Sequence, residues 1–130
     1  MITPINDALY EVICGWWKAY GWPIPQENIL SKRRYICFIG EKPMCAGFLY
    51  KDDSSAFGLM DFIVCNPDST KEERAQAIAE LVAHIESVAK EIGIKALLTI
   101  SVTEKLTNKL QDLGYYRTQE THLAHLIKNI

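Results

Sequence analysis

The sequence lacks the excess of positive charge that general nucleic-acid binding requires. Its 14 lysines and arginines are outnumbered by 16 aspartates and glutamates, which gives a formal net charge of −2. The basic run Lys32-Arg33-Arg34 is typical of a solvated loop. We therefore expect neither nucleic acid nor an anionic membrane surface as a partner.

Long hydrophobic runs are also missing. No apolar stretch reaches the roughly 18 residues that a membrane-spanning helix needs. Residues 1–4 show no basic segment followed by an apolar stretch, so we expect no secretory signal. Both features predict a cytoplasmic protein that does not enter membranes.

Cysteine pairs with C-x-x-C spacing are absent, which argues against a zinc cluster, and we expect no metal. The chain has four cysteines, all within apolar segments: Cys14, Cys37, Cys45 and Cys65. Free thiols in such segments behave as small hydrophobes and suit a reducing cytoplasm. A cysteine nucleophile is the less common alternative. His84, His122 and His125 form neither a triad nor a ligand set by their spacing.

What the sequence does contain is enough apolar material for one core. Of its 130 residues 48% are hydrophobic and 23% charged, the usual balance of a globular domain. No linker, repeat or low-complexity segment divides the chain. We predict a single domain over residues 1–130.

The first half of the chain predicts a helix followed by three strands. Apolar residues recur at helical spacing from Ile5 to Tyr20, and Gly21 and Pro23 end that pattern. β-Branched and aromatic residues then fill 35–39 and 44–50, with a tight turn between them. A third strand is expected over 59–65, whose nearly continuous apolar character indicates cover on both faces.

The second half predicts helix, strand, helix and a last strand. Thr70 and Glu73 form a capping box, and the helix that they begin ends at Gly93. A strand follows at 96–100, then a short helix opened by a second capping box of Ser101 and Glu104. Residues 115 onward, especially 121–127, alternate like a final strand. The order is α-β-β-β-α-β-α-β, with a parallel crossover in a mixed sheet.

One junction of this arrangement suits a phosphate group. Ligands of open sheets gather where a strand ends and the next helix begins, here between Cys65 and Thr70. Free amides and the helix dipole favour anions there, although every such junction shares these properties.

At this junction the chain resembles the GNAT (general N-acetyltransferase) family. The resemblance extends over nearly the whole length: a first helix, a hairpin with Ala46-Gly47-Phe48, a central strand, a long helix and a short helix closing with Leu-Gly-Tyr. The family motif R/Q-x-x-G-x-G/A is matched by residues 74–79, except that Ala77 replaces the first glycine. The resemblance implies an α/β (α+β) fold with a mixed, mostly antiparallel central sheet flanked by helices.

The family resemblance also implies acetyl-CoA as co-substrate and two groups of cofactor-binding residues. The pyrophosphate would lie against Arg74, Ala75, Gln76, Ala77, Ile78 and Ala79. The pantetheine arm would run beside Ile63, Val64 and Cys65. From the residues alone, the alanines equally fit close packing of a helix on the sheet, with Arg74 on a solvated face.

Two departures from the family pattern bear on activity. The segment 67–74 is longer and more acidic than is usual in the family. Leu110 stands where the family has the tyrosine that protonates the departing thiolate. Tyr116 or Tyr115 is the candidate substitute, and Tyr115 fits the family's aromatic packing position better.

Asp61 is the candidate base because it is the one acid within the central strand. Strict alternation places it on the same face as Ile63 and Cys65. The equal alternative to a functional role is that Asp61 lies toward an exposed end of the strand. Trp17 and Trp22 are candidates for the acceptor site. In the family that this chain resembles, the first helix and the loop after it border that site, and Trp17 lies off the main apolar stripe.

Three functions remain open. The first is direct, acetyl-CoA-dependent transfer of an acyl group to a small-molecule or protein amine. The second is a catalytically silent relative that binds a ligand or protein, and the third is an interaction protein such as a homodimer joined through the C-terminal strand. The short length also resembles small GNAT-like proteins encoded by bacteriophages, which would place it in a host cytoplasm.

Overall fold

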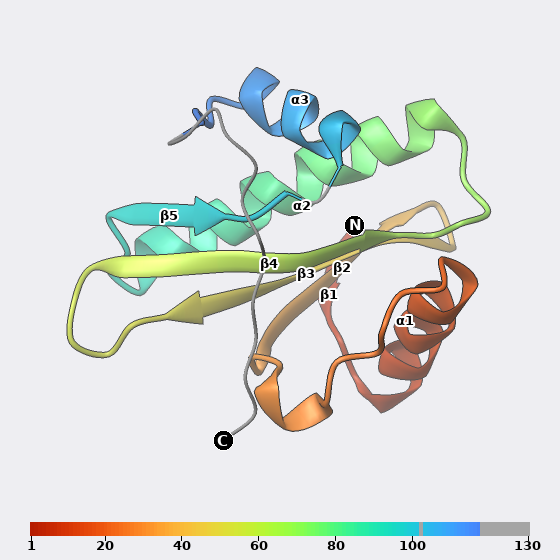
Figure 1. Ribbon diagram of the computed structural model, residues 1–130, viewed down its shortest axis with the longest axis horizontal. Helices are drawn as coiled ribbons and strands as arrows, with labels where there is room; N and C mark the ends of the chain where they lie inside the picture. The colour runs from red at the N-terminus through yellow and green to blue at the C-terminus, as the bar shows by residue number, and fades with distance from the viewer. Residues whose placement is uncertain (102, 118–130) are drawn as a thin grey trace. The chain divides into compact units, whose positions relative to one another are not determined.

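The computed structural model describes residues 1–101 and 103–117 (Figure 1). Its elements are β1 (Ile2–Pro4), α1 (Asp7–Ala19), η1 (Glu27–Ile29), β2 (Arg33–Ile39), β3 (Lys42–Lys51), β4 (Phe57–Cys65), α2 (Lys71–Glu91), β5 (Ala96–Thr99) and α3 (Glu104–Asp112). They fall into two compact units, Met1–Thr99 and Ile100–Ile130, and each is described by itself.

The first unit is built on a five-stranded sheet in the order β1-β2-β3-β4-β5. The pairs β1–β2, β2–β3 and β3–β4 are antiparallel, and β4 pairs with β5 in parallel. This arrangement confirms the predicted mixed, mostly antiparallel sheet and the crossover through α2. The fold class is α+β.

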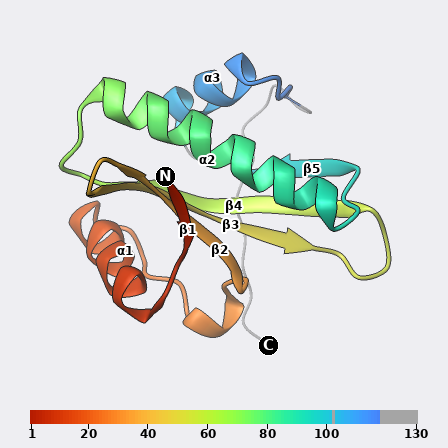
Figure 2. The ribbon, with the colours of Figure 1, turned by 180° about the vertical axis from the view of Figure 1, so that it is seen from behind.

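The predicted order of elements was wrong at its start, because β1 precedes the first helix. Ile2 pairs with Cys37 and Pro4 with Tyr35, which places β1 at an edge of the sheet (Figure 2). Three residues are too few to show an alternating pattern in the sequence. The predicted last strand lies largely beyond residue 117, outside the described residues.

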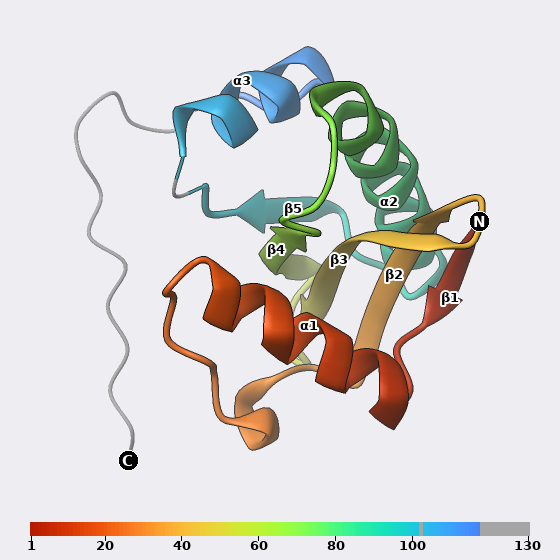
Figure 3. The same cartoon turned by 90° about the vertical axis from the view of Figure 1, so that its right-hand side faces the viewer.

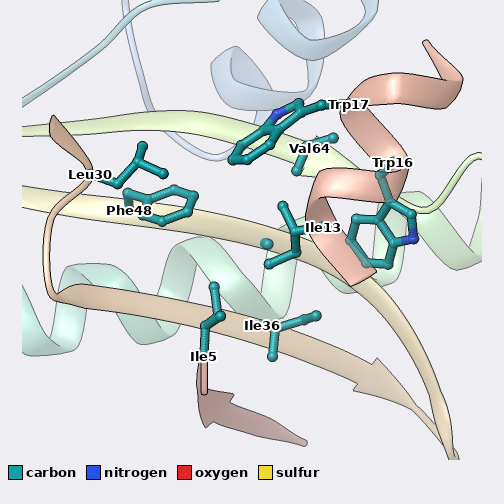
Figure 4. Close-up of a cluster of buried hydrophobic side chains, with 9 residues drawn as sticks. Ile5, Ile13, Trp16, Trp17, Leu30, Ile36, Phe48 and Val64 are labelled. Atoms are coloured by element: carbon teal, nitrogen blue, oxygen red, sulfur yellow. The ribbon is translucent and has the colours of Figure 1, made fainter. Parts of the chain in front are cut away.

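The two long helices cover opposite faces of the sheet (Figure 3). Behind α1 lies a core of side chains from the helix, the β1–α1 connection, η1's end and three strands (Figure 4): Ile5, Ile13, Trp16, Trp17, Leu30, Ile36, Ala46, Phe48 and Val64. On the other face α2 buries a stripe at helical spacing: Ala77, Ile78, Leu81, Val82, Ile85 and Ala89. Gly47 lets this helix approach closely, since an added Cβ would lie 3.2 Å from Ile85 Cδ1.

Side chains fix the start of both helices. Asn6 Oδ1 accepts a hydrogen bond from the Leu9 amide at 2.9 Å and caps α1. Thr70 and Glu73 form the predicted capping box of α2. Gly93, with a φ of 88°, follows the end of α2 as predicted.

The second unit contains α3, and its cap differs from the prediction. Thr103, not Ser101, is the N-cap residue, because its side-chain oxygen accepts from the Leu106 amide at 3.2 Å. Ser101 instead donates to the Thr103 carbonyl. Both residues have capping hydroxyls, so the sequence spacing favoured the wrong one.

Candidate functional site

A β-bulge interrupts β4 at its middle. Asp61 pairs with Phe48 and Val64 pairs with Ala46, so the single residue Gly47 of β3 lies opposite two residues of β4. One of these two, Phe62, has a φ of 55°, a left-handed conformation that is rare for residues other than glycine. Its amide donates to Asp61 Oδ1 at 2.7 Å, which holds the bulge in place.

Because of the bulge, Asp61 lies on the opposite face of the sheet from the one that regular alternation predicts. Asp61 is paired with Phe48, whose ring lies in the core behind α1. Ile63 lies on the α2 side, beside Gly47 and Leu81. The expectation that Asp61 shares a face with Ile63 and Cys65 was therefore wrong, because the extra residue shifts the alternation by one.

Beyond the bulge, one edge of β4 pairs with no strand that the structure describes. Parallel pairing with β5 runs from Phe57–Ala96 to Met60–Thr99, whereas β4 continues to Cys65. Figure 1 shows the short β5 beside one part of the longer β4. Among the described strands, residues 61–65 therefore have β3 on one edge only. We call this segment the open half of β4; it contains the predicted Ile63, Val64 and Cys65.

The hydrogen bonds at the end of β4 show which backbone groups face its open edge. The Asn66 amide donates to the Met44 carbonyl of β3 at 2.7 Å. Because successive residues of a strand direct their backbone groups to opposite edges, those of Cys65 face away from β3. The Tyr20 hydroxyl, which donates to the Cys65 carbonyl at 2.9 Å, occupies that side. The same alternation places the Ile63 amide at the open edge.

Aromatic side chains from the end of α1 lie beside this carbonyl. The rings of Tyr20 and Trp22 stack with centroids 4.5 Å apart. Both residues are 38% exposed, so the pair has a face open to solvent. The structure thus brings Trp22 to the end of β4 through Tyr20. The Tyr20 hydroxyl was missed in the sequence analysis, because helical spacing assigned Tyr20 to the core.

Arg74 lies close to the same strand end. Its Nη1 donates to the Ser69 carbonyl at 2.6 Å and to Ser69 Oγ at 3.1 Å. Burial, followed by the neighbouring Cys65, raises the pKa of Tyr20, and the positive charge of Arg74 opposes this rise. Within the described residues no carboxylate forms an ion pair with Arg74. A cation so placed is suited to an anionic ligand.

The helix begins earlier than the family-like motif. Because α2 starts at Lys71, residues 74–79 lie inside it, and the Arg74 amide already donates to the Thr70 carbonyl at 3.1 Å. The amides of 75–79 are likewise committed to the helix. Ala77 is fully buried, in agreement with the packing alternative.

Only the first turn of α2 retains free donors. A helix leaves four amides without helical acceptors, here those of residues 70–73. The capping box takes two of them: Glu73 Oε1 accepts from the Thr70 amide at 2.9 Å, and Thr70 Oγ1 accepts from the Glu73 amide at 3.1 Å. The amides of Lys71 and Glu72 are the remaining first-turn donors.

The acidic residues of this turn are partly neutralised. Glu73 forms an ion pair with Lys42 at 3.6 Å. The hydrogen bond from the Thr70 amide, followed by the charge of Lys42, lowers the pKa of Glu73 below its usual value. The carboxylate thus stays ionised at the helix start and competes there with any other anion.

The remaining predicted site residues differ in how far they are exposed to solvent. Trp17 is 3% exposed and stacks on Phe48 at 6.2 Å, so it is part of the core and not off the apolar face as predicted. Asp61 is 7% exposed, which makes it a buried acid and not one at an exposed strand end. Tyr116 belongs to the second unit and is 84% exposed.

The described residues contain neither a membrane-spanning helix nor a metal-binding cluster. Of the described helices, none is both long and apolar enough to cross a bilayer. Within the same residues, no three histidine, cysteine, aspartate or glutamate side chains are grouped so as to hold a metal ion.

No protein-family model matches this chain, and no curated protein matches it. Solved structures do. The ribosomal-protein-S18-alanine N-acetyltransferase from Escherichia coli matches with a TM-score of 0.72 and 11% identity, over 92% of this chain and 79% of that chain. A probable acetyltransferase matches with a TM-score of 0.70 and 15% identity, over 100% and 99%.

A third match is the N-acetylglutamate synthase from Neisseria gonorrhoeae, solved with coenzyme A and N-acetyl-glutamate. Its TM-score is 0.64 at 15% identity, over 85% of this chain and 27% of that chain. Identities this low show the fold alone: the chain has the fold of GNAT acetyltransferases, as the sequence resemblance implied. These matches lend no support to the resemblance to phage-encoded proteins.

Proposed function

We propose that this protein binds acetyl-CoA, or a similar acyl-CoA thioester, and transfers the acyl group directly to a primary amine. The observation that carries the proposal is the open half of β4, whose edge away from β3 pairs with no described strand beside the bulge. Unpaired strand edges attract ligands that supply hydrogen-bonding partners. The free thiols of the described chain suit action in a reducing cytoplasm.

The residues present fit such a thioester in two places. Ile63, Val64 and Cys65 would lie beside the pantetheine arm, whose amides need backbone partners. Arg74, with the amides of Lys71 and Glu72, would hold the pyrophosphate at the start of α2. The set is smaller than the predicted Arg74–Ala79, because Ala75, Gln76, Ala77, Ile78 and Ala79 have their amides within the helix.

The reaction requires one proton to leave the amine and one to reach the departing thiolate. The amine nitrogen attacks the thioester carbonyl carbon, the carbon–sulfur bond breaks, and an amide bond forms. Amides near Cys65 would polarise the carbonyl oxygen. Asp61, directly or through a water, would take the amine proton. Tyr116 stays the predicted proton donor to the thiolate; it belongs to the second unit, which is described by itself.

The acceptor would meet the stacked rings of Tyr20 and Trp22. These rings expose a flat aromatic surface next to the end of β4. Such a surface suits an amine that carries a flat or apolar group, or a protein side chain of that kind. Trp17 is not part of this proposal because it is buried in the core.

A catalytically silent binding protein is the second candidate, and one observation favours it. Glu73 holds the Thr70 amide and places a carboxylate at the point where a pyrophosphate would bind. Leu110, in place of the family's tyrosine, points the same way. This candidate predicts ligand or protein binding without turnover.

Thermal unfolding with acetyl-CoA tests the proposal. Because a ligand that binds only the folded state stabilises it by mass action, millimolar acetyl-CoA should raise the Tm. Arg74→Glu should abolish the rise. Lys95→Glu is the matched control, since it makes the same change of charge at an exposed loop position and should leave the rise intact.

Turnover is then measured as thiol release with a panel of amines. Release that depends on both acetyl-CoA and an amine supports transfer. A rise in Tm without release supports the silent candidate. No rise in Tm in the wild-type protein, or an equal rise in Arg74→Glu, would contradict the proposed binding site.

A further inference from the structure

Three thiols form a row across neighbouring strands on the α2 side of the sheet. Cys37 of β2 pairs with Cys45 of β3, and Cys45 pairs with Cys65 of β4. The Sγ atoms of Cys45 and Cys65 are 2.9 Å apart and share a hydrogen bond. Cys37 instead donates to Glu80 Oε2 of α2 at 3.3 Å. The row therefore contains one thiol–thiol contact and one thiol held by a carboxylate.

The backbone brings Cys45 and Cys65 to a separation that a disulfide can span. The Asn66 amide donates to the Met44 carbonyl, so Asn66 and Met44 are a hydrogen-bonded pair of the two strands. Cys45 and Cys65 are therefore a non-hydrogen-bonded pair, in which Cα atoms are about 4.5 Å apart. Disulfides bridge Cα separations of roughly 4.4–6.8 Å, so only a small side-chain movement is required.

The two thiols differ in access and in acidity. Cys45 is fully buried, and burial, followed by its hydrogen bond to Cys65, raises the pKa of its thiol well above the usual value. Cys65 is half-buried, and the hydrogen bond from Cys45, with the charge of Arg74, lowers its pKa. Cys65 is therefore the thiol that ionises and that a small oxidant reaches.

We propose that Cys65 and Cys45 form a disulfide when a hydroperoxide oxidises the pair. The Cys65 thiolate attacks the terminal oxygen of the hydroperoxide ROOH, the O–O bond breaks, and Cys65 becomes a sulfenic acid while RO⁻ leaves, which is hydroxide for hydrogen peroxide. The Cys45 sulfur then attacks the Cys65 sulfur, the S–O bond breaks, and the hydroxyl group leaves with the Cys45 proton as water. The two thiols lose two electrons, and the peroxide gains them.

Cys37 and Cys14 are internal controls for this reaction. Burial, followed by the hydrogen bond to Glu80, raises the pKa of Cys37 to about 11, so its thiol stays protonated. Cys14 belongs to α1, on the opposite side of the sheet from the row. The disulfide does not depend on the proposed acyl transfer, because its geometry involves no ligand.

Peptide mapping of the oxidised full-length chain tests the proposal. The reduced protein is treated with a small molar excess of hydrogen peroxide, the peroxide is removed, and free thiols are alkylated in denaturant before digestion. We expect mass spectrometry to find Cys45 cross-linked to Cys65, with a loss of two hydrogen atoms, and Cys14 and Cys37 alkylated. Cys65→Ser should lose the cross-link, and Cys37→Ser should keep it.

Three outcomes would overturn the proposal. They are a bridge that includes Cys37 or Cys14, conversion of Cys65 to a sulfinic acid while Cys45 is alkylated, and four alkylated thiols after a treatment that oxidises a small dithiol. The wild-type map decides among them even if a variant does not fold.

Discussion

The two halves of β4 have different neighbours although they belong to one continuous strand. Residues 58–60 lie between β3 and β5 and have paired strands on both edges, whereas residues 61–65 pair, among the described strands, with β3 alone. The change occurs next to Asp61, at the bulge of Phe62 and Ile63. A single strand thereby supplies both a framework paired on two edges and the proposed binding edge, and the bulge marks the boundary between them.

The largest expected effect concerns Asp61, at the boundary between the halves. Asp61→Asn keeps an oxygen that accepts from the Phe62 amide, so the fold should be retained. It removes the proposed base, and kcat/KM should fall by about 10²–10⁴-fold. Thiol-release kinetics measure this, with Asp53→Asn in an exposed turn as control. Activity within a few-fold of wild type would show that Asp61 does not take the proton.

The paired half of β4 should tolerate an added side chain less well than other parts of the fold. At Gly58 an added Cβ would lie 2.6 Å from Ile94 Cδ1 and 2.9 Å from the Tyr50 carbonyl oxygen. Gly58→Ala should therefore lower the free energy of unfolding by about 1–3 kcal/mol in urea denaturation.

Gly15→Ala is the control for that substitution. Gly15 lies within α1 and an added Cβ meets nothing within 4 Å, so this variant should be unchanged or up to about 1 kcal/mol more stable. Equal stability of the two alanine variants would contradict the tight packing of the paired half.

On the open half, Tyr20→Phe removes the hydrogen bond to the Cys65 carbonyl. We expect a loss of about 0.5–1.5 kcal/mol of unfolding free energy. Tyr116→Phe, at an 84% exposed side chain, should change it by less than about 0.5 kcal/mol. If both variants lose the same amount, the Tyr20 hydroxyl does not stabilise this strand end.

The smallest expected effect is a pH dependence from the capping box. The pKa of Glu73 is lowered in the folded protein, so its contribution to stability is complete above the unfolded value of 4.5 and is lost as pH falls through the lower, folded value. Glu73→Gln should flatten the slope of Tm against pH in that acidic range. An unchanged slope would mean that the capping carboxylate does not couple to folding.

Local signals allowed most of the fold to be predicted from the sequence. The capping box of Thr70 and Glu73, and Gly93 after the helix, bounded α2 because they act within a few residues of one another. The hairpin and the crossover followed from turn residues and apolar runs. The strand Ile2–Pro4 was missed because its pairing with β2 is a long-range contact that three residues do not reveal.

The site was less accessible to sequence reasoning. Alternation assumes a regular strand, and the bulge at Phe62 moved Asp61 to the other face. The motif at 74–79 was expected to hold a pyrophosphate with its amides, but these amides lie within α2, which starts at Lys71. Trp17 in α1 and Tyr20 at its C-cap show a third limit. Only tertiary packing decides that Trp17 is buried while the Tyr20 hydroxyl reaches the Cys65 carbonyl.

Amide chemical shifts in a titration with acetyl-CoA test the central claim most directly. If the open half of β4 holds the thioester, the backbone amide signals of Ile63 and Cys65 should move with added ligand. Those of Gly58 and Leu59, in the paired half, should move little. Equal movement in both halves, or movement confined to residues outside β4, would contradict the account.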